Sequence, residues 1–392
     1  MRTILPILVL LSGCAATTPP ADPAPPPAAA QPAEARVTFD ASRILSEHAA
    51  GIADRGTGRR VTPADPVRVA SISKLVVALG VMRLVEARTL DLDRDVSDYL
   101  GWRLRNPAFP DTPITLRLLL SHRSSLTDGI DYIIPVGVRV QDALADPKAW
   151  DAAHAPGTYF RYTNLNFPVI GTAMERAAGE RFDRLMQREV FRPLGLDGCY
   201  NWSGCSDAAV ARAVVLYRAN GDVARDDLHG VRPACPTVAK GPCDLTSYRI
   251  GDNGGMFSPQ GGMNISMRDL ARVGQMLLRR GGDFLTPASI ATIETPVWTF
   301  DGTNGDNDQG FTCQYGLATH SLPTARPGCD DDLFGDGRPR VGHSGEAYAL
   351  RSGLWIDRAR GTGVAFFATA VADGSKGETR FSPQEERLAR GR

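Results

Sequence analysis

The chain has 392 residues, of which 44 are basic and 44 acidic, so its formal net charge is zero. Apolar residues make up 43% and charged residues 22%, which is normal for a globular protein. A neutral chain gives no reason to expect nucleic acid as a partner. Only four of the basic residues are lysines, so a lysine beside other reactive side chains is distinctive.

The N-terminal segment predicts export. Arg2 precedes an apolar run from Ile4 to Leu11, which is too short to span a bilayer and is typical of a signal peptide. The following Leu11-Ser12-Gly13-Cys14 resembles the lipobox of bacterial lipoproteins. This resemblance implies removal of a signal peptide (1–13), acylation of Cys14, and a membrane anchor in the bacterial periplasm or at the cell surface. An ordinary secretory signal with an incidental cysteine is the alternative.

A tether rich in Ala and Pro is expected over residues 14–36, because it has too few large apolar residues to pack. One domain is expected over 37–392. Apart from Cys14, the chain has six cysteines in three close pairs, Cys199 and Cys205, Cys235 and Cys243, and Cys313 and Cys329. Their even number favours disulfides, and nearest-neighbour pairing is one of fifteen possible connectivities. Neither their spacing nor any cofactor motif predicts a metal or a cofactor.

Hydrophobic periodicity and capping residues predict the elements of the domain. Helices are expected at 71–87, 114–121 with Thr115 as N-cap, 167–178, 182–190, 267–280 after Ser266, and from about 382. Strands are expected at 49–54, 67–70, 352–357 and 363–370, the last two as a hairpin. Because strands cluster at both chain ends, we expect an α/β (α+β) fold, with an antiparallel sheet closed by both ends and flanked by helices. An all-helical subdomain is expected as an insert at about 85–250.

Ser71-Ile72-Ser73-Lys74 is the first motif that indicates chemistry. Residues three apart at a helix start lie on one face, so a lysine amine there can serve as the base for a serine nucleophile. Burial would lower the pKa of the lysine, and the helix N-terminus would favour developing negative charge. The pattern alone is weak, because a capping serine followed by a surface lysine has the same spacing.

Two later motifs strengthen it. Tyr162-Thr163-Asn164 and His343-Ser344-Gly345 follow Ser71 and Lys74 in a fixed order. With these motifs, the chain resembles the serine β-lactamase-like superfamily, in the branch of class C β-lactamases, D-Ala-D-Ala carboxypeptidases, D-aminopeptidases and related esterases. The resemblance extends over about 49–370 and implies a β-lactamase/transpeptidase-like fold.

The resemblance also implies roles for these residues. Ser71 would form an acyl-enzyme, and Lys74 and Tyr162 would share the proton transfers, with phenolate character at Tyr162 favoured by the lysine. Asn164 would position Lys74 and bind the substrate amide. His343, Ser344 and Gly345, on an edge strand, would contact the carboxylate end of the substrate. The backbone N–H groups of Ser71 and Glu346 would form the oxyanion hole.

The sequence departs from class C β-lactamases at His343, where those enzymes have a lysine. A neutral histidine anchors a carboxylate less well than a lysine does. The expected function is a periplasmic serine hydrolase of a peptide, amide or ester. A true β-lactamase and a penicillin-recognising or peptidoglycan-binding lipoprotein with negligible turnover are the alternatives. An α/β-hydrolase is disfavoured because no Gly-x-Ser-x-Gly elbow is present.

Overall fold

The computed structural model describes residues 31–391, which belong to one compact unit. The predicted signal peptide, Cys14 and most of the predicted tether lie outside the described residues. Within the described part, no helix is both long and apolar enough to cross a membrane.

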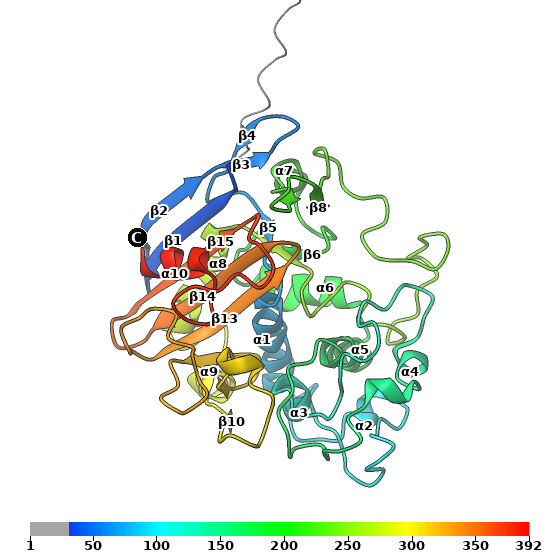
Figure 1. Cartoon of the computed structure of the whole chain (residues 1–392). Coiled ribbons are helices and arrows are strands. Elements are labelled where there is room, and N and C mark those ends of the chain that lie inside the picture. Colours follow the sequence, from blue (N-terminus) through cyan, green and yellow to red (C-terminus); the bar gives the residue numbers. More distant parts are fainter. Residues whose placement is uncertain (1–30, 392) are drawn as a thin grey trace, which may run out of the picture. The chain divides into compact units, whose positions relative to one another are not determined.

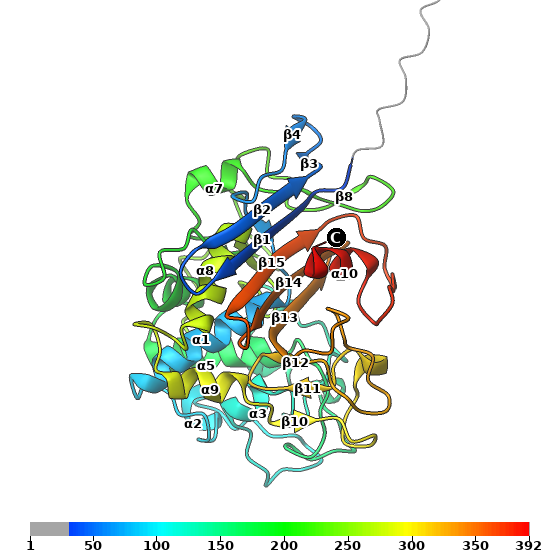
Figure 2. The ribbon, with the colours of Figure 1, turned by 90° about the vertical axis from the view of Figure 1, so that its left-hand side faces the viewer.

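An eight-stranded antiparallel sheet is the largest element of the fold, with strand order β10-β11-β12-β13-β14-β15-β1-β2 (Figures 1 and 2). Its strands are β1 (Glu34–Asp40), β2 (Ile44–Ala50), β10 (Trp298–Thr299), β11 (Gln314–Tyr315), β12 (His320–Leu322), β13 (Arg340–Ala347), β14 (Leu350–Asp357) and β15 (Thr362–Ala368). The N-terminal strand β1 pairs with β15, so strands from both chain ends complete the sheet, as expected. The predicted hairpin is β14–β15.

Helices cover both faces of this sheet. The described helices are α1 (Ile72–Glu86), α2 (Ser97–Leu100), α3 (Leu116–Leu120), α4 (Val140–Ala143), α5 (Asn166–Ala178), α6 (Phe182–Met186), α7 (Asp207–Ala211), α8 (Met267–Leu278), α9 (Pro287–Glu294) and α10 (Pro383–Arg390). In Figure 2, α10 lies in front of the sheet and α8 and α1 lie behind it. Alternation along β14 reflects this, because Leu354 belongs to the α8-side core and Trp355 to the α10-side core.

Helix α1 is buried on nearly all sides, between the sheet and the helical part of the fold (Figure 1). This explains why its sequence is apolar all round and not only on one stripe. The predicted caps are present, since Thr115 accepts a hydrogen bond from the backbone of Leu118, and Ser266 from that of Asp269.

Several expectations were wrong in detail. β1 begins at Glu34, inside the expected tether, and Val37 and Phe39 are fully buried. The strand expected at 49–54 is interrupted at Gly51, whose φ is +90°, so β2 and β3 (Ile52–Asp54) belong to different sheets. The helix expected at 182–190 is α6 followed by a π-helical turn, Gln187–Phe191.

The inserted region is not all-helical. It also contains β6 (Cys199–Tyr200), β7 (Leu216–Tyr217) and β8 (Val223–Arg225). The remaining short strands are β4 (Arg59–Arg60), β5 (Val67–Arg68) and β9 (Met263–Ile265), and the 3₁₀ turns are Pro147–Ala149 and Asp308–Gly310. Three disulfides join nearest-neighbour cysteines, Cys199–Cys205, Cys235–Cys243 and Cys313–Cys329.

Candidate active site

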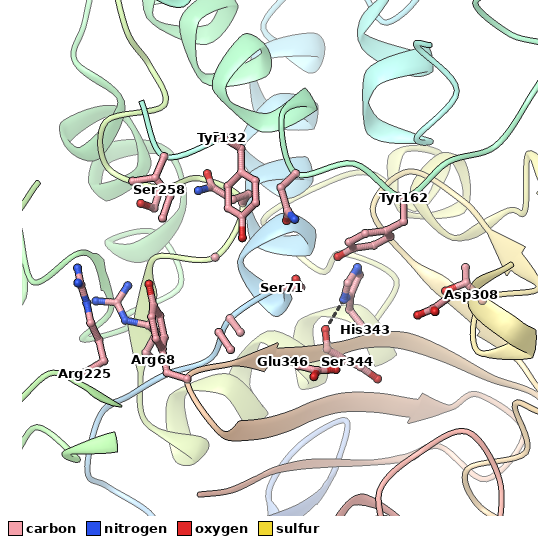
Figure 3. A pocket seen from close by; sticks show the side chains of 18 of the residues that line it. Arg68, Ser71, Tyr132, Tyr162, Arg225, Ser258, Asp308, His343, Ser344 and Glu346 are labelled. Carbon is pink, nitrogen blue, oxygen red and sulfur yellow. Dashed lines mark hydrogen bonds between the residues drawn. The ribbon is translucent and has the colours of Figure 1, made fainter. Parts of the chain in front are cut away.

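A cavity of about 680 Å³ opens at the N-terminus of α1. Predicted site residues from three separate segments line it, and Figure 3 shows Ser71, Tyr162, His343, Ser344 and Glu346 around it. Asn164 lines the same cavity. The fold therefore brings together side chains that lie more than 250 positions apart in the sequence.

The turn before α1 holds Ser71 at the edge of the cavity. β5 ends at Arg68, so the strand predicted to reach position 70 is shorter, and Ala70 has a φ of +47°. Such a conformation is unfavourable for a residue with a Cβ, and it persists only where the surroundings enforce it. Here Ser352 Oγ donates a hydrogen bond to the carbonyl of Val69 at 3.0 Å.

Strand β13 packs against the same turn through Gly345. A Cβ at this position would lie 2.3 Å from the carbonyl oxygen of Val69, so only glycine allows the approach. Within the described residues, the backbone N–H of Ser71 donates no hydrogen bond. This N–H is thus available to a group bound at the end of α1.

Lys74 lies fully buried beneath the serine. Its Nζ donates to Ser71 Oγ at 2.9 Å, to Asn164 Oδ1 at 2.8 Å and to the carbonyl of Gln260 at 2.8 Å. Burial lowers the pKa of Lys74 to about 7, although the charge of Asp128 acts in the opposite direction. A substantial fraction of the amine is therefore neutral near pH 7 and can accept a proton from the serine.

Asp128 was not predicted, yet it fixes the loop that carries Asn164. Its Oδ2 accepts hydrogen bonds from the backbone and the side-chain Nδ2 of Asn164, and its Oδ1 accepts one from the backbone of Leu165. Because Nδ2 faces this carboxylate, Oδ1 of Asn164 must face Lys74. The only sequence signal was the turn dipeptide Asp128-Gly129, which gives no hint of such a contact.

Tyr162 is placed as predicted, but its ionisation differs from the expectation. Its ring stacks on His122 with a centroid distance of 4.3 Å, and Lys74 Nζ lies 4.9 Å from the ring centroid. Burial raises the pKa of Tyr162 well above its ordinary value, and a hydrogen bond with Ser71 offsets this only in part. The expectation of phenolate character at Tyr162 is therefore wrong, because burial favours the neutral phenol.

His343 is also placed at the cavity, but its ring nitrogens are engaged. Nδ1 lies 2.5 Å from the carbonyl oxygen of Ser344 and must carry the hydrogen, so Nε2 accepts from the hydroxyl of Tyr315 at 2.9 Å. Burial holds the pKa of His343 well below its usual value, so the ring is neutral. The resemblance implied that this ring would contact the carboxylate end of the substrate. That expectation is wrong for this structure, because both ring nitrogens are already hydrogen-bonded within the protein.

His343, Ser344 and Gly345 were expected on an edge strand. This expectation is wrong for β13 as a whole, because β13 lies between β12 and β14 in the sheet. However, its pairing with β12 ends at Gly342, so the side towards the cavity has no partner strand from His343 onward.

The cavity wall also contains buried polar atoms of the predicted Ser344 and of Gln260 and His320, which were not predicted. Three buried atoms there have no hydrogen-bond partner among the described residues, namely Gln260 Oε1, His320 Nε2 and Ser344 Oγ. Buried polar atoms are normally paired, so these atoms suit the polar groups of a bound molecule or water.

No group of three or more His, Cys, Asp or Glu residues suited to a metal ion occurs within residues 31–391.

The family model described as Beta-lactamase matches residues 35–384. The chain belongs to this family. Curated relatives include penicillin-binding protein 4 of Amycolatopsis lactamdurans, 33% identical over 39% of this chain and 40% of the relative. Esterase EstB of Burkholderia gladioli is 32% identical over 40% of this chain and 43% of the relative. The chain thus spans about two-fifths of the length of these relatives.

Solved structures show the same fold. EstCE1, described as a hydrolase with promiscuous acyltransferase activity, is 21% identical, and the match has a TM-score of 0.67 and covers 92% of this chain and 93% of the other. The D-amino acid amidase of Ochrobactrum anthropi matches with a TM-score of 0.66 at 16% identity, over 91% of this chain and 90% of the other. These likenesses establish the β-lactamase/transpeptidase-like fold.

Proposed function

We propose that this chain is a serine hydrolase that forms an acyl-enzyme at Ser71 with an ester, amide or peptide substrate. The observation that carries the proposal is the buried Lys74, whose amine is hydrogen-bonded to Ser71 Oγ and has a pKa of about 7. A lysine in solution would be almost fully protonated at this pH and could not act as a base.

Acylation would begin when neutral Lys74 accepts the proton of Ser71 as Oγ attacks the substrate carbonyl carbon. The backbone N–H groups of Ser71 and Glu346 would stabilise the oxyanion. Neutral Tyr162, whose ring centroid lies 4.9 Å from Lys74 Nζ, would relay the proton from Lys74 to the departing group. Attack by water on the ester of Ser71 would then release the acid and regenerate the hydroxyl.

Hydrolysis of β-lactams is a less favoured activity for this site. His343 replaces the lysine of class C β-lactamases, and the neutral ring has both nitrogens engaged within the protein. A substrate carboxylate would receive no charged contact from this position. We therefore expect esters and amides to be turned over faster than a cephalosporin.

Export and a lipid anchor at Cys14 are part of the proposal. Three disulfides within one domain are typical of proteins that fold in an oxidising compartment, which supports export. Incorporation of a labelled fatty acid into the wild-type chain but not into Cys14→Ser would support the anchor. Equal incorporation would contradict it.

A panel of substrates tests the enzymatic proposal. Nitrophenyl esters, D-amino-acid amides, a D-Ala-D-Ala peptide and a chromogenic cephalosporin would be assayed with wild type, Ser71→Ala and Ser258→Ala. Ser258 also lines the cavity and serves as the matched control. We expect turnover to disappear only in Ser71→Ala. Binding of penicillin without turnover of any member of the panel would favour the penicillin-recognising alternative.

A further inference from the structure

The two ends of the cavity differ in charge. In the view of Figure 3, Arg68 and Arg225 lie on one side of Ser71, and Tyr162 and Asp308 lie on the other. Asp306 also lines the cavity, as does Glu346, which is paired with Arg351. Because Arg351 and Arg380 offset Glu346 and Asp308 in part, an anionic group of a substrate is bound more favourably at the end that contains Arg225 than at the end that contains Asp308.

The two arginines are not equivalent. Arg68 is almost fully buried and donates from Nε and Nη2 to the carboxylate of Asp226, both at 2.8 Å, and from Nη1 to Asn201 at 2.8 Å. Asp226 also accepts a hydrogen bond from Trp202 Nε1 at 2.9 Å. The charge of Arg68 is thus neutralised within the protein.

Arg225 is the available cation. It precedes Asp226 at the end of β8 and is exposed, and within residues 31–391 its guanidinium has no hydrogen bond or ion pair. Its Cζ lies 5.6 Å from the ring centroid of Tyr348, which stacks below it as a cation–π partner. The buried pair of Arg68 and Asp226 positions the strand end that carries this side chain.

Tyr348 occupies a strained turn. With Ala349 it forms the two-residue connection of β13 and β14, and their φ values are +54° and +59°. Asn-Gly is the usual choice for such a turn, so a tyrosine here is unfavourable for the backbone. Strain of this kind is common at binding sites.

The cavity wall contains apolar and aromatic side chains beside the polar side chains of Asn201, Ser258 and Gln260. Tyr132, Ile133, Val238 and Tyr348 line it. The loop of the Cys235–Cys243 disulfide is held there, because the carbonyl of Val238 accepts a hydrogen bond from the backbone of Val136 at 2.8 Å. An apolar middle part of a chain that reaches from Ser71 to Arg225 can therefore pack against these four side chains.

The proposed mechanism decides which part of the substrate occupies this end. The leaving group receives its proton through Tyr162, so it lies on the side of Tyr162 and Asp308. The acyl group then points towards Arg225. We propose, on the basis of the proposed function, that Arg225 determines specificity by binding a carboxylate at the far end of an apolar acyl group.

The test compares two esters with the same acyl chain length and leaving group, the 4-nitrophenyl monoester of adipic acid and 4-nitrophenyl hexanoate. The readout is the ratio of their kcat/KM values for wild type, Arg225→Gln and Arg225→Lys. A charged hydrogen bond at a partly exposed site supports about a tenfold preference. Arg218→Gln is the matched control, because Arg218 is exposed on the same hairpin but does not line the cavity.

We expect wild type to prefer the monoester, Arg225→Gln to lower the ratio about tenfold, and Arg225→Lys to retain part of the preference. Added salt should lower the wild-type ratio towards that of Arg225→Gln. An unchanged ratio in Arg225→Gln, or an equal loss with both esters, would overturn the inference. Failure of wild type to hydrolyse either ester would instead overturn the proposed function on which the inference rests.

Discussion

The buried amine of Lys74 predicts how the activity depends on pH. A pKa lowered from 10.5 to about 7 raises the neutral fraction at pH 7 from roughly one molecule in 3000 to about one half. Because only the neutral amine can accept the proton of Ser71, kcat/KM should rise with pH and reach half its plateau near pH 7. At pH 5 roughly 1% of the amine is neutral, so kcat/KM should be about a hundredfold below the plateau.

The assay is hydrolysis of 4-nitrophenyl butyrate between pH 5 and 9, followed at the isosbestic wavelength of the product. Lys74→Arg should lower kcat/KM by about a hundred to ten thousandfold, because a guanidinium remains protonated. Lys148→Arg is the control, since the side chain of Lys148 is exposed and does not line the cavity. A half-maximum near pH 10, a flat profile, or full activity in Lys74→Arg would refute the reasoning.

Two further predictions concern the support of the site. Gly345→Ala should abolish esterase activity or folding, because the new Cβ would lie 2.3 Å from the carbonyl oxygen of Val69. Gly241→Ala is the control, because no atom lies within 4 Å of the Cβ that it would add. This variant should behave as wild type in activity and thermal unfolding. Asp226→Asn should lower the free energy of unfolding by about 3–5 kcal/mol, measured by urea denaturation, because it leaves the cation of Arg68 buried without a countercharge.

The exposed pair of Asp93 and Arg117 gives a control for the second prediction. Surface ion pairs contribute little, so Asp93→Asn should cost less than about 1 kcal/mol. Equal effects of Asp93→Asn and Asp226→Asn would mean that the buried pair contributes no more than a surface contact.

Local sequence patterns were sufficient to predict the positions of the long helices. The spacing of apolar residues and the capping serine before Met267 predicted α8, and the structure differs from that prediction by two residues at the C-terminal end. The strand β1 was missed because Glu34 directly follows an Ala- and Pro-rich stretch. The alternation of Ala35, Val37 and Phe39 was nevertheless visible in the sequence, and all three side chains are buried.

Residue types and their order were also sufficient to bring Ser71, Lys74, Tyr162 and Asn164 into one predicted site, and the structure places them together. Their protonation could not be predicted, because it depends on burial and on partners distant in the sequence. The neutral state of His343 follows from its burial, and its tautomer follows from Tyr315 and from its own strand backbone.

The remaining features depend on long-range packing, as Arg225 illustrates. Nothing in the local sequence of Arg225 distinguishes it from the other arginines. It becomes distinctive only because Asp226 pairs with Arg68, 158 positions away, so that the guanidinium of Arg225 has no hydrogen bond or ion pair within residues 31–391.

Covalent labelling tests the central claim, that Ser71 is the nucleophile, most directly. The folded chain would be treated with a fluorophosphonate probe, and the modified peptide would be identified by mass spectrometry in wild type and Ser71→Ala. We predict one adduct on wild type, located on Ser71, and none on Ser71→Ala. An unlabelled wild type, an adduct on another residue, or equal labelling of Ser71→Ala would contradict the account.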